Sequence, residues 1–390
     1  MTNYNSSTFR FGTSGLFFIQ GFTVVSWASR LLDIRQKFNL TDGQLGAVLL
    51  IPPLAQLAMM AFSGILVRRF GSGRVARVGF FLLPFLLPVL GEVPTIPGLA
   101  AAMFLFGLTT NLANIAANTQ GLNVERLYGK SIMASFHGCW SAGGVCAILF
   151  SIILTNCGTS LRVNFFAAWA VCMIVYCLVF SKLIIGDMVS QVKKNCGKQS
   201  LWSANLLLFG LICFGCLGCE GSINSWITLY YKGVVRTPDS WIRLGFFVYM
   251  AAVTFSRFSA DLFVRKSGEY CCIRIAGVLI FLGFLLIVAC PHLVTASAGC
   301  ILLGFGTSAI VPICYSLTGK QYGDSLPVAL SIVNGISFTG FLLMPALVGG
   351  ISGFTGLRMA FAVFGVLSVA CISLILLVEK RECSENEEQT

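Results

Sequence analysis

Long apolar runs alternate with short polar turns along nearly the whole chain. Each run is close to the roughly 20 residues that a helix needs to cross a bilayer. The pattern predicts an all-α integral membrane protein with twelve transmembrane helices. The predicted helices cover residues 13–36, 44–67, 74–91, 97–122, 131–155, 162–184, 202–231, 241–264, 271–290, 293–318, 327–352 and 358–378.

A polar, lysine-containing segment divides these helices into two sets of six. The sequence therefore predicts an N-terminal six-helix bundle (1–185), a cytoplasmic linker (186–200), a C-terminal six-helix bundle (201–378) and a cytoplasmic tail (379–390). Because the tail is short and charged, we expect it to be disordered.

A basic turn after the second helix recurs in the second half of the chain. Gly71 lies among Arg68, Arg69, Arg74 and Arg77, and Gly268 follows Arg265 and Lys266 and precedes Arg274. Gly71 and Gly268 are 197 positions apart, close to half of the 390 residues. The repeat predicts two pseudo-symmetric bundles, an architecture typical of secondary transporters.

Composition and charge agree with a membrane location. Mean hydropathy is +0.86 and only 11% of residues are charged, whereas soluble proteins carry roughly 25%. The net charge of +11 does not indicate nucleic-acid binding, because the basic residues lie in short turns between apolar runs. With both termini in the cytoplasm, the predicted inner loops hold most of the Lys and Arg, as the positive-inside rule requires.

Three cysteines have a spacing that resembles an iron–sulfur motif: Cys213, Cys216 and Cys219. On a continuous helix they spread along one stripe and cannot surround a cluster, so we expect them to pack as small hydrophobic residues. The two histidines are far apart and the acids are not clustered. We therefore expect no metal and no cofactor.

The turn after the second helix reads G-x-L-x-x-R-x-G from Gly64 to Gly71. Together with the two six-helix halves, it resembles the signature of the major facilitator superfamily. The resemblance implies a gating role for this turn, although Arg68 stands where the family usually has an acid. Arg257 and Asp261, four residues apart on one predicted helix, could pair and compensate. The gating candidates are Gly64, Arg69, Gly71, Arg74, Arg257 and Asp261.

Further segments narrow the resemblance. Phe136-His137-Gly138-Cys139-Trp140, Glu220-Gly221 with Trp226, and Gly304-Phe305-Gly306 with Pro312 look like a bacterial branch near the fucose–galactose–glucose:proton symporters. This resemblance implies alternating access in a bacterial inner membrane, and we expect a monomer.

Polar side chains inside predicted spans are costly in hydrocarbon, so they are candidates for substrate contacts. Several lie at helical spacing on one face, where they line a cavity or bind neighbouring helices; Arg30 can also reach the membrane surface. The substrate-binding candidates are Gln20, Trp27, Arg30, Asn111, Asn114, Asn118, Asn224 and Asn334.

Three titratable residues are candidates for proton coupling. Glu220 lies within the seventh predicted span, where an acid can take up and release a proton, or can only hold helices together. Asp33 lies three residues after Arg30 and can pair with it. His137 titrates near neutral pH, but a hydrogen bond to the loop at Glu125 and Arg126 explains it equally well.

Motifs of serine hydrolases, zinc proteases and P-loop enzymes are missing from the sequence, so we do not expect an enzyme. The sequence favours a secondary active transporter that moves a small polar, sugar-like organic solute with protons by alternating access. Two alternatives stay open: a proton-driven exporter of drugs or amphipathic metabolites, and a non-transporting receptor or scaffold.

Overall fold

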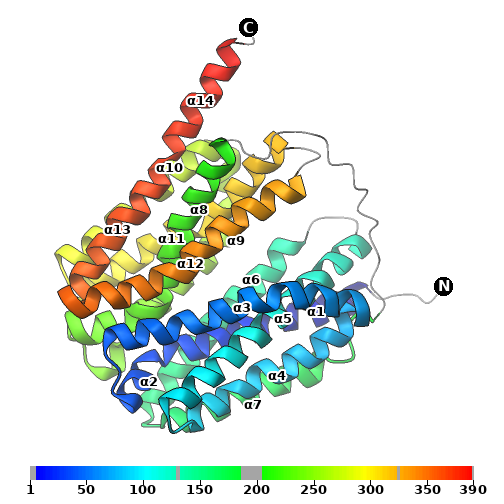
Figure 1. Cartoon of the computed structure of the whole chain (residues 1–390), viewed down its shortest axis with the longest axis vertical. Helices are drawn as coiled ribbons and strands as arrows, with labels where there is room; N and C mark the ends of the chain where they lie inside the picture. Colours follow the sequence, from blue (N-terminus) through cyan, green and yellow to red (C-terminus); the bar gives the residue numbers. More distant parts are fainter. Residues whose placement is uncertain (1–5, 129–131, 186–203, 323–325, 389–390) are drawn as a thin grey trace. The chain divides into compact units, whose positions relative to one another are not determined.

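The computed structural model describes residues 6–128, 132–185, 204–322 and 326–388. All regular elements in these ranges are helices (Figure 1). The first half contains α1 (Ser6–Ser29), α2 (Leu31–Phe38), α3 (Asp42–Phe70), α4 (Ser72–Glu92), α5 (Ile96–Tyr128), α6 (Met133–Asn156) and α7 (Leu161–Val179). The second half contains α8 (Ala204–Tyr230), the short η1 (Tyr231–Val235) and η2 (Asp239–Trp241), α9 (Leu244–Ser267), α10 (Glu269–Ala289), α11 (Leu293–Tyr322), α12 (Leu326–Thr355), α13 (Leu357–Ser373) and α14 (Ile375–Glu388).

Helix length and composition confirm a membrane-spanning protein. Within the described residues, ten helices are long and apolar enough to cross a bilayer, or eleven if the bent pair α1 and α2 forms one span. Every predicted span from 13–36 to 358–378 coincides with a long helix or a bent pair of helices. The all-helical fold predicted from the hydropathy pattern is therefore confirmed.

The chain divides into two compact units. The first contains residues 1–40 and 47–191, and the second contains residues 41–46 and 192–390. The first turn of α3 is thus grouped with the second unit, where the Asp42 carboxylate accepts a hydrogen bond from the Ser352 hydroxyl at 3.0 Å. The predicted linker, residues 186–200, lies outside the described residues.

The helices of each unit pack in the same order. In the first unit, α1 contacts α4, α5, α6 and α7, and α4 packs against α5 and α7. In the second unit, α8 contacts α11, α12 and α13, and α10 packs against α11 and α13. When α1, α4, α5, α6 and α7 are matched with α8, α10, α11, α12 and α13, every one of these contacts has a counterpart except that between α1 and α4. This pattern is what a duplicated bundle predicts.

The repeated basic turn has the same backbone in both units. Gly71 separates α3 from α4 with φ 84° and ψ 144°, and Gly268 separates α9 from α10 with φ 80° and ψ 160°. This region of backbone space is open almost only to glycine, since a Cβ would clash there. The position of each glycine therefore fixes where one helix stops and the next begins.

Two parts of the chain differ from the prediction. The first span begins earlier, at Ser6, and it is not one straight helix, because α1 and α2 meet at Arg30 with a bend of 44°. The tail expected to be disordered continues as α14 to Glu388. Near its start, the Glu379 carboxylate lies 3.5 Å from the Arg274 guanidinium of α10, which ties α14 to the second unit.

Candidate transport site

An acid–base pair lies inside the second unit, between two of its long helices. Glu220 on α8 and Arg257 on α9 approach to 3.8 Å between Oε1 and Nη2. Their side chains are 12% and 27% exposed. Charged side chains within membrane-spanning helices are costly and are therefore candidates for function, which makes this pair the strongest candidate site in this unit.

Hydrogen-bonded hydroxyl groups connect the same helices to α11. The Tyr249 hydroxyl lies 3.1 Å from the Thr307 hydroxyl, and both side chains are buried. The Cys216 thiol donates to the Thr307 carbonyl at 3.2 Å. Ser256, one residue before Arg257, contacts the Ser308 hydroxyl at 2.5 Å. These bonds fix α8, α9 and α11 around the acid–base pair.

Asn224 extends the polar face of α8 one turn beyond Glu220. Its Oδ1 is buried and has no hydrogen-bond partner among the described residues. A buried amide oxygen without a partner is destabilising, which is compatible with a group that accepts a hydrogen bond from solute or water.

Aromatic residues at the end of α8 hold this helix in place. The Trp226 indole N–H donates to the Pro345 carbonyl at 2.9 Å, and the Tyr230 hydroxyl donates to the Ile287 carbonyl at 2.9 Å. The Tyr231 hydroxyl lies 2.9 Å from the Ser297 hydroxyl. All three rings are buried, so they anchor the helix that carries Glu220 and Asn224.

Sequence analysis does not predict the pairing of Glu220 with Arg257. The sequence predicts instead that Arg257 pairs with Asp261 in the gate, and the Asp261 side chain lies outside the described residues. One signal could have indicated the observed pair. Glu220 and Arg257 carry opposite charges and lie within predicted spans of the same half. Charged side chains inside a membrane bundle usually pair with one another.

In the first unit, Arg30 lies at the break between α1 and α2. Its side chain is 2% exposed, and its Nε lies 3.0 Å from the Asp33 carboxylate. Its Nη1 donates to the Thr155 hydroxyl of α6. The i, i+3 pair suggested by the sequence is therefore present, and it connects the bend to α6.

The remaining candidates on α1 are buried. Trp27 is 5% exposed and packs against Phe106 of α5, with ring centroids 6.4 Å apart. Gln20 is also 5% exposed, and its Oε1 has no hydrogen-bond partner among the described residues. Like the Asn224 Oδ1 in the second unit, this acceptor is a candidate for hydrogen bonding to water or a solute.

The asparagine side chains on α5 and α12 form hydrogen bonds within one helix and between helices. The Asn111 Oδ1 accepts a hydrogen bond from Ser63 of α3 at 2.8 Å, which joins neighbouring helices. The Asn118 amide donates to the Asn114 carbonyl and to its Oδ1, both at 2.9 Å. Asn334 on α12 is exposed and accepts from the Tyr315 hydroxyl at 2.9 Å. The structure thus supports the hydrogen-bonding alternative for Asn111.

His137 is exposed near the start of α6, and its ring meets the Phe17 ring edge-on at 5.2 Å. The Glu125 carboxylate accepts from the backbone N–H groups of Ile132 and Met133 at 2.8 and 2.9 Å. Glu125 therefore caps the N-terminus of α6, where a negative charge is favourable.

The gating candidates near Gly71 lie together in the α3–α4 turn. Arg69 stacks on Phe70, and the Arg74 guanidinium donates to the Phe70 carbonyl at 3.4 Å. Gly64 lies seven residues before Gly71 on α3, and no atom lies within 4 Å of a Cβ added there. Arg74 thus binds the end of the helix that precedes it, which stabilises the turn.

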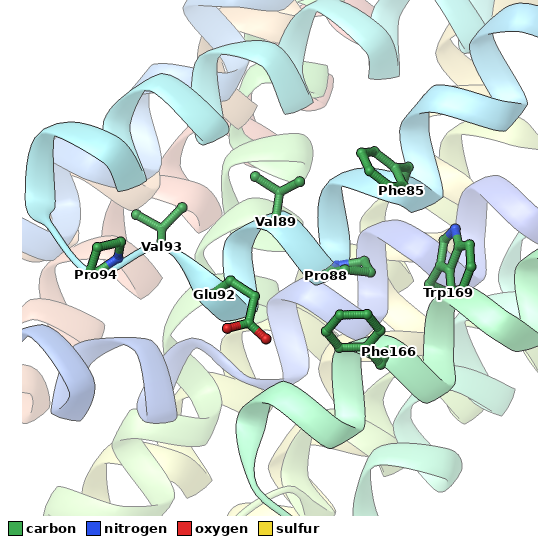
Figure 2. Close-up of a pocket in the computed structure, with 8 residues that line it drawn as sticks. All are labelled: Phe85, Pro88, Val89, Glu92, Val93, Pro94, Phe166 and Trp169. Atoms are coloured by element: carbon green, nitrogen blue, oxygen red, sulfur yellow. The ribbon is translucent and has the colours of Figure 1, made fainter.

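A separate hollow lies between α4 and α7 of the first unit (Figure 2). Its volume is about 430 Å³, within the usual range of ligand-sized cavities. Its walls are apolar apart from Glu92 at one end: Phe85, Pro88, Val89, Val93, Pro94, Phe166 and Trp169. None of the predicted site residues lines it.

Comparison with known proteins decides the family. The model of the Major Facilitator Superfamily matches residues 12–300 and 295–390, nearly the whole chain. The chain belongs to the Major Facilitator Superfamily. It is 30% identical over 372 residues to the uncharacterized transporter y4wD of Sinorhizobium fredii, covering 94% of this chain and 97% of that protein.

Solved structures of superfamily members have the same fold. The crystal structure of a bacterial homologue of the human lysosomal transporter Spinster matches with a TM-score of 0.76 and 13% identity, covering 97% of this chain and 98% of that one. The nucleoside transporter NupG matches with a TM-score of 0.70 and 16% identity, covering 95% and 99%. This protein is therefore an integral membrane protein of a transporter superfamily.

Proposed function

We propose that the protein is a secondary active transporter that moves a small polar organic solute with protons by alternating access. The observation that carries this proposal is the Glu220–Arg257 pair within the membrane-spanning part of the second unit. Sugar-like solutes fit the buried amide oxygen of Asn224, one turn from Glu220 on α8, because hydroxyl groups donate hydrogen bonds to such acceptors.

The pair supplies a means of coupling. As a carboxylate, Glu220 attracts the Arg257 guanidinium across 3.8 Å. When Glu220 takes up a proton, it loses its charge and the attraction to Arg257 ends. Arg257 is then available to donate hydrogen bonds to a solute oxygen. Proton binding and solute binding are thus linked through one side chain, as coupled transport requires.

Asp33 and His137 remain candidates for further proton steps. Arg30 and the amides at Asn111, Asn114, Asn118 and Asn334 remain candidates for solute contacts. The proposal also places the protein near the fucose–galactose–glucose:proton symporters. It includes a monomeric protein in a bacterial inner membrane, with both termini in the cytoplasm.

The solute is identified first by binding. We expect the thermal melting midpoint of the purified protein to rise with one class among sugars, amino sugars, nucleosides, organic acids and lipophilic cations. If the solute binds only when Glu220 is protonated, this rise in the melting midpoint depends on pH. A shift with lipophilic cations alone contradicts the proposal and favours an exporter of amphipathic compounds.

The role of Glu220 is then tested by substitution in proteoliposomes loaded with that solute. Glu220→Gln imitates the protonated acid permanently, so we expect loss of accumulation driven by a pH gradient while solute exchange continues. Glu269→Gln is the matched control, because Glu269 lies at the start of α10 and accepts from Ser316 at 2.8 Å. Accumulation by Glu220→Gln at the wild-type level would refute the assignment.

A further inference from the structure

The hollow between α4 and α7 is apolar along its length and charged at one end. Phe85 and Phe166, on its two walls, are 47% and 41% exposed, so the hollow opens to the surroundings of the helices. Both helices are apolar enough to span a bilayer. The surroundings of this hollow are therefore lipid, and Figure 2 shows the Phe85 ring on α4 and the Phe166 and Trp169 rings on α7.

Three charges gather where α4 ends and α7 begins. The Glu92 carboxylate pairs with the Arg162 guanidinium, and both side chains are well exposed, at 44% and 68%. The Lys37 ammonium donates to the Gly91 carbonyl at 2.7 Å, next to Glu92. Arg162 also lies over the ring of Phe166, 6.0 Å from its centroid. Two cations and one carboxylate thus leave a net positive charge at the mouth of the hollow.

We propose that this groove binds an anionic phospholipid, with one acyl chain along the apolar walls and the headgroup phosphate at Arg162. The charged end lies at the ends of two membrane-spanning helices, which is the level of lipid headgroups. An exposed arginine–carboxylate pair in water contributes little, so a phosphate can displace Glu92 from Arg162 without a large loss.

The second unit has an arginine at the corresponding helix position, but its guanidinium has different hydrogen-bond partners. Arg358 is the second residue of α13, as Arg162 is the second residue of α7. Its guanidinium donates to the carbonyls of Val288 and Ala289 at the end of α10, at 2.8 and 3.2 Å. Arg358 is therefore held by helix-end carbonyls, whereas Arg162 lies beside an apolar groove.

The test is native mass spectrometry of the full chain, titrated with phosphatidylglycerol or with phosphatidylethanolamine. We expect phosphatidylglycerol to bind the wild type more tightly. Arg162→Gln should weaken its binding about fivefold, the effect of one cation near an anionic lipid surface. Arg358→Gln should leave it unchanged, and size-exclusion profiles check that both variants fold.

Two more variants separate the headgroup from the acyl chain. Glu92→Gln removes the competing carboxylate and should tighten phosphatidylglycerol binding, a gain that a merely structural ion pair would not produce. Val89→Trp fills the groove and should weaken both lipids. The proposal is overturned if Arg162→Gln binds phosphatidylglycerol like the wild type, if Glu92→Gln does not tighten it, or if Val89→Trp has no effect.

Discussion

Two arginine–carboxylate pairs in the first unit have the same chemistry and very different surroundings. Arg30 is 2% exposed and its partner Asp33 is 26% exposed, whereas Arg162 and Glu92 are 68% and 44% exposed. Removing one member of a buried pair leaves an uncompensated charge, but an exposed charge is solvated by water. The two pairs therefore differ in their contribution to stability.

Asp33→Asn should lower the free energy of unfolding by about 3 kcal/mol, because it leaves the buried Arg30 guanidinium without its counter-charge. Glu92→Gln, the matched control, should change it by less than about 1 kcal/mol. Thermal melting of both variants in the same detergent measures the difference. Equal melting midpoints would mean that Asp33 does not neutralise Arg30.

Local spacing predicted the Arg30–Asp33 pair and could not predict the Glu220–Arg257 pair. Arg30 and Asp33 are three residues apart, so helical geometry alone brings them together. Glu220 and Arg257 lie on different helices, and their contact depends on how α8 and α9 pack. For the same reason, the sequence offered a cavity or a neighbouring helix for Asn111, and only the structure revealed its bond to Ser63.

At the scale of elements, the α3–α4 and α9–α10 turns depend on single glycines. Gly71 has φ 84° and Gly268 has φ 80°, and no side chain fills the space around Gly268. Backbone conformation, rather than packing, is therefore what requires glycine at these turns.

Gly71→Ala should destabilise the protein by about 2 kcal/mol, because alanine is strained in this region of backbone space. Gly64→Ala is the control, since Gly64 lies within α3 with nothing within 4 Å of an added Cβ. There, alanine should stabilise the helix by up to about 1 kcal/mol. Melting midpoints that fall equally in both variants would contradict the conformational explanation.

Hydropathy located the helices well but not their breaks or extensions. The predicted span 13–36 is apolar as far as Ala28 and then contains Arg30, Asp33 and Arg35, and a run of polar residues near a helix end does not distinguish a bend from a straight helix. The bend is stabilised instead by contacts of Arg30 with Asp33 and Thr155. Likewise, the charged tail gave no apolar signal for α14, whose start is held by the Arg274–Glu379 pair.

At the scale of the whole molecule, the sequence alone indicates the duplication. The offset between Gly71 and Gly268 predicted two related bundles, and five helix contacts of the first unit have counterparts in the second. The superfamily match over residues 12–300 and 295–390 supports the same architecture. Since one fold serves many cargoes, neither the repeat nor the fold specifies the solute.

The most direct test of proton-coupled transport is the pH of a weakly buffered medium around proteoliposomes when the identified solute is added. Uptake with protons predicts that the medium becomes alkaline with the wild type and with Glu269→Gln. With Glu220→Gln, solute should still exchange but the pH should stay constant. Net solute uptake by the wild type without any pH change would contradict the account.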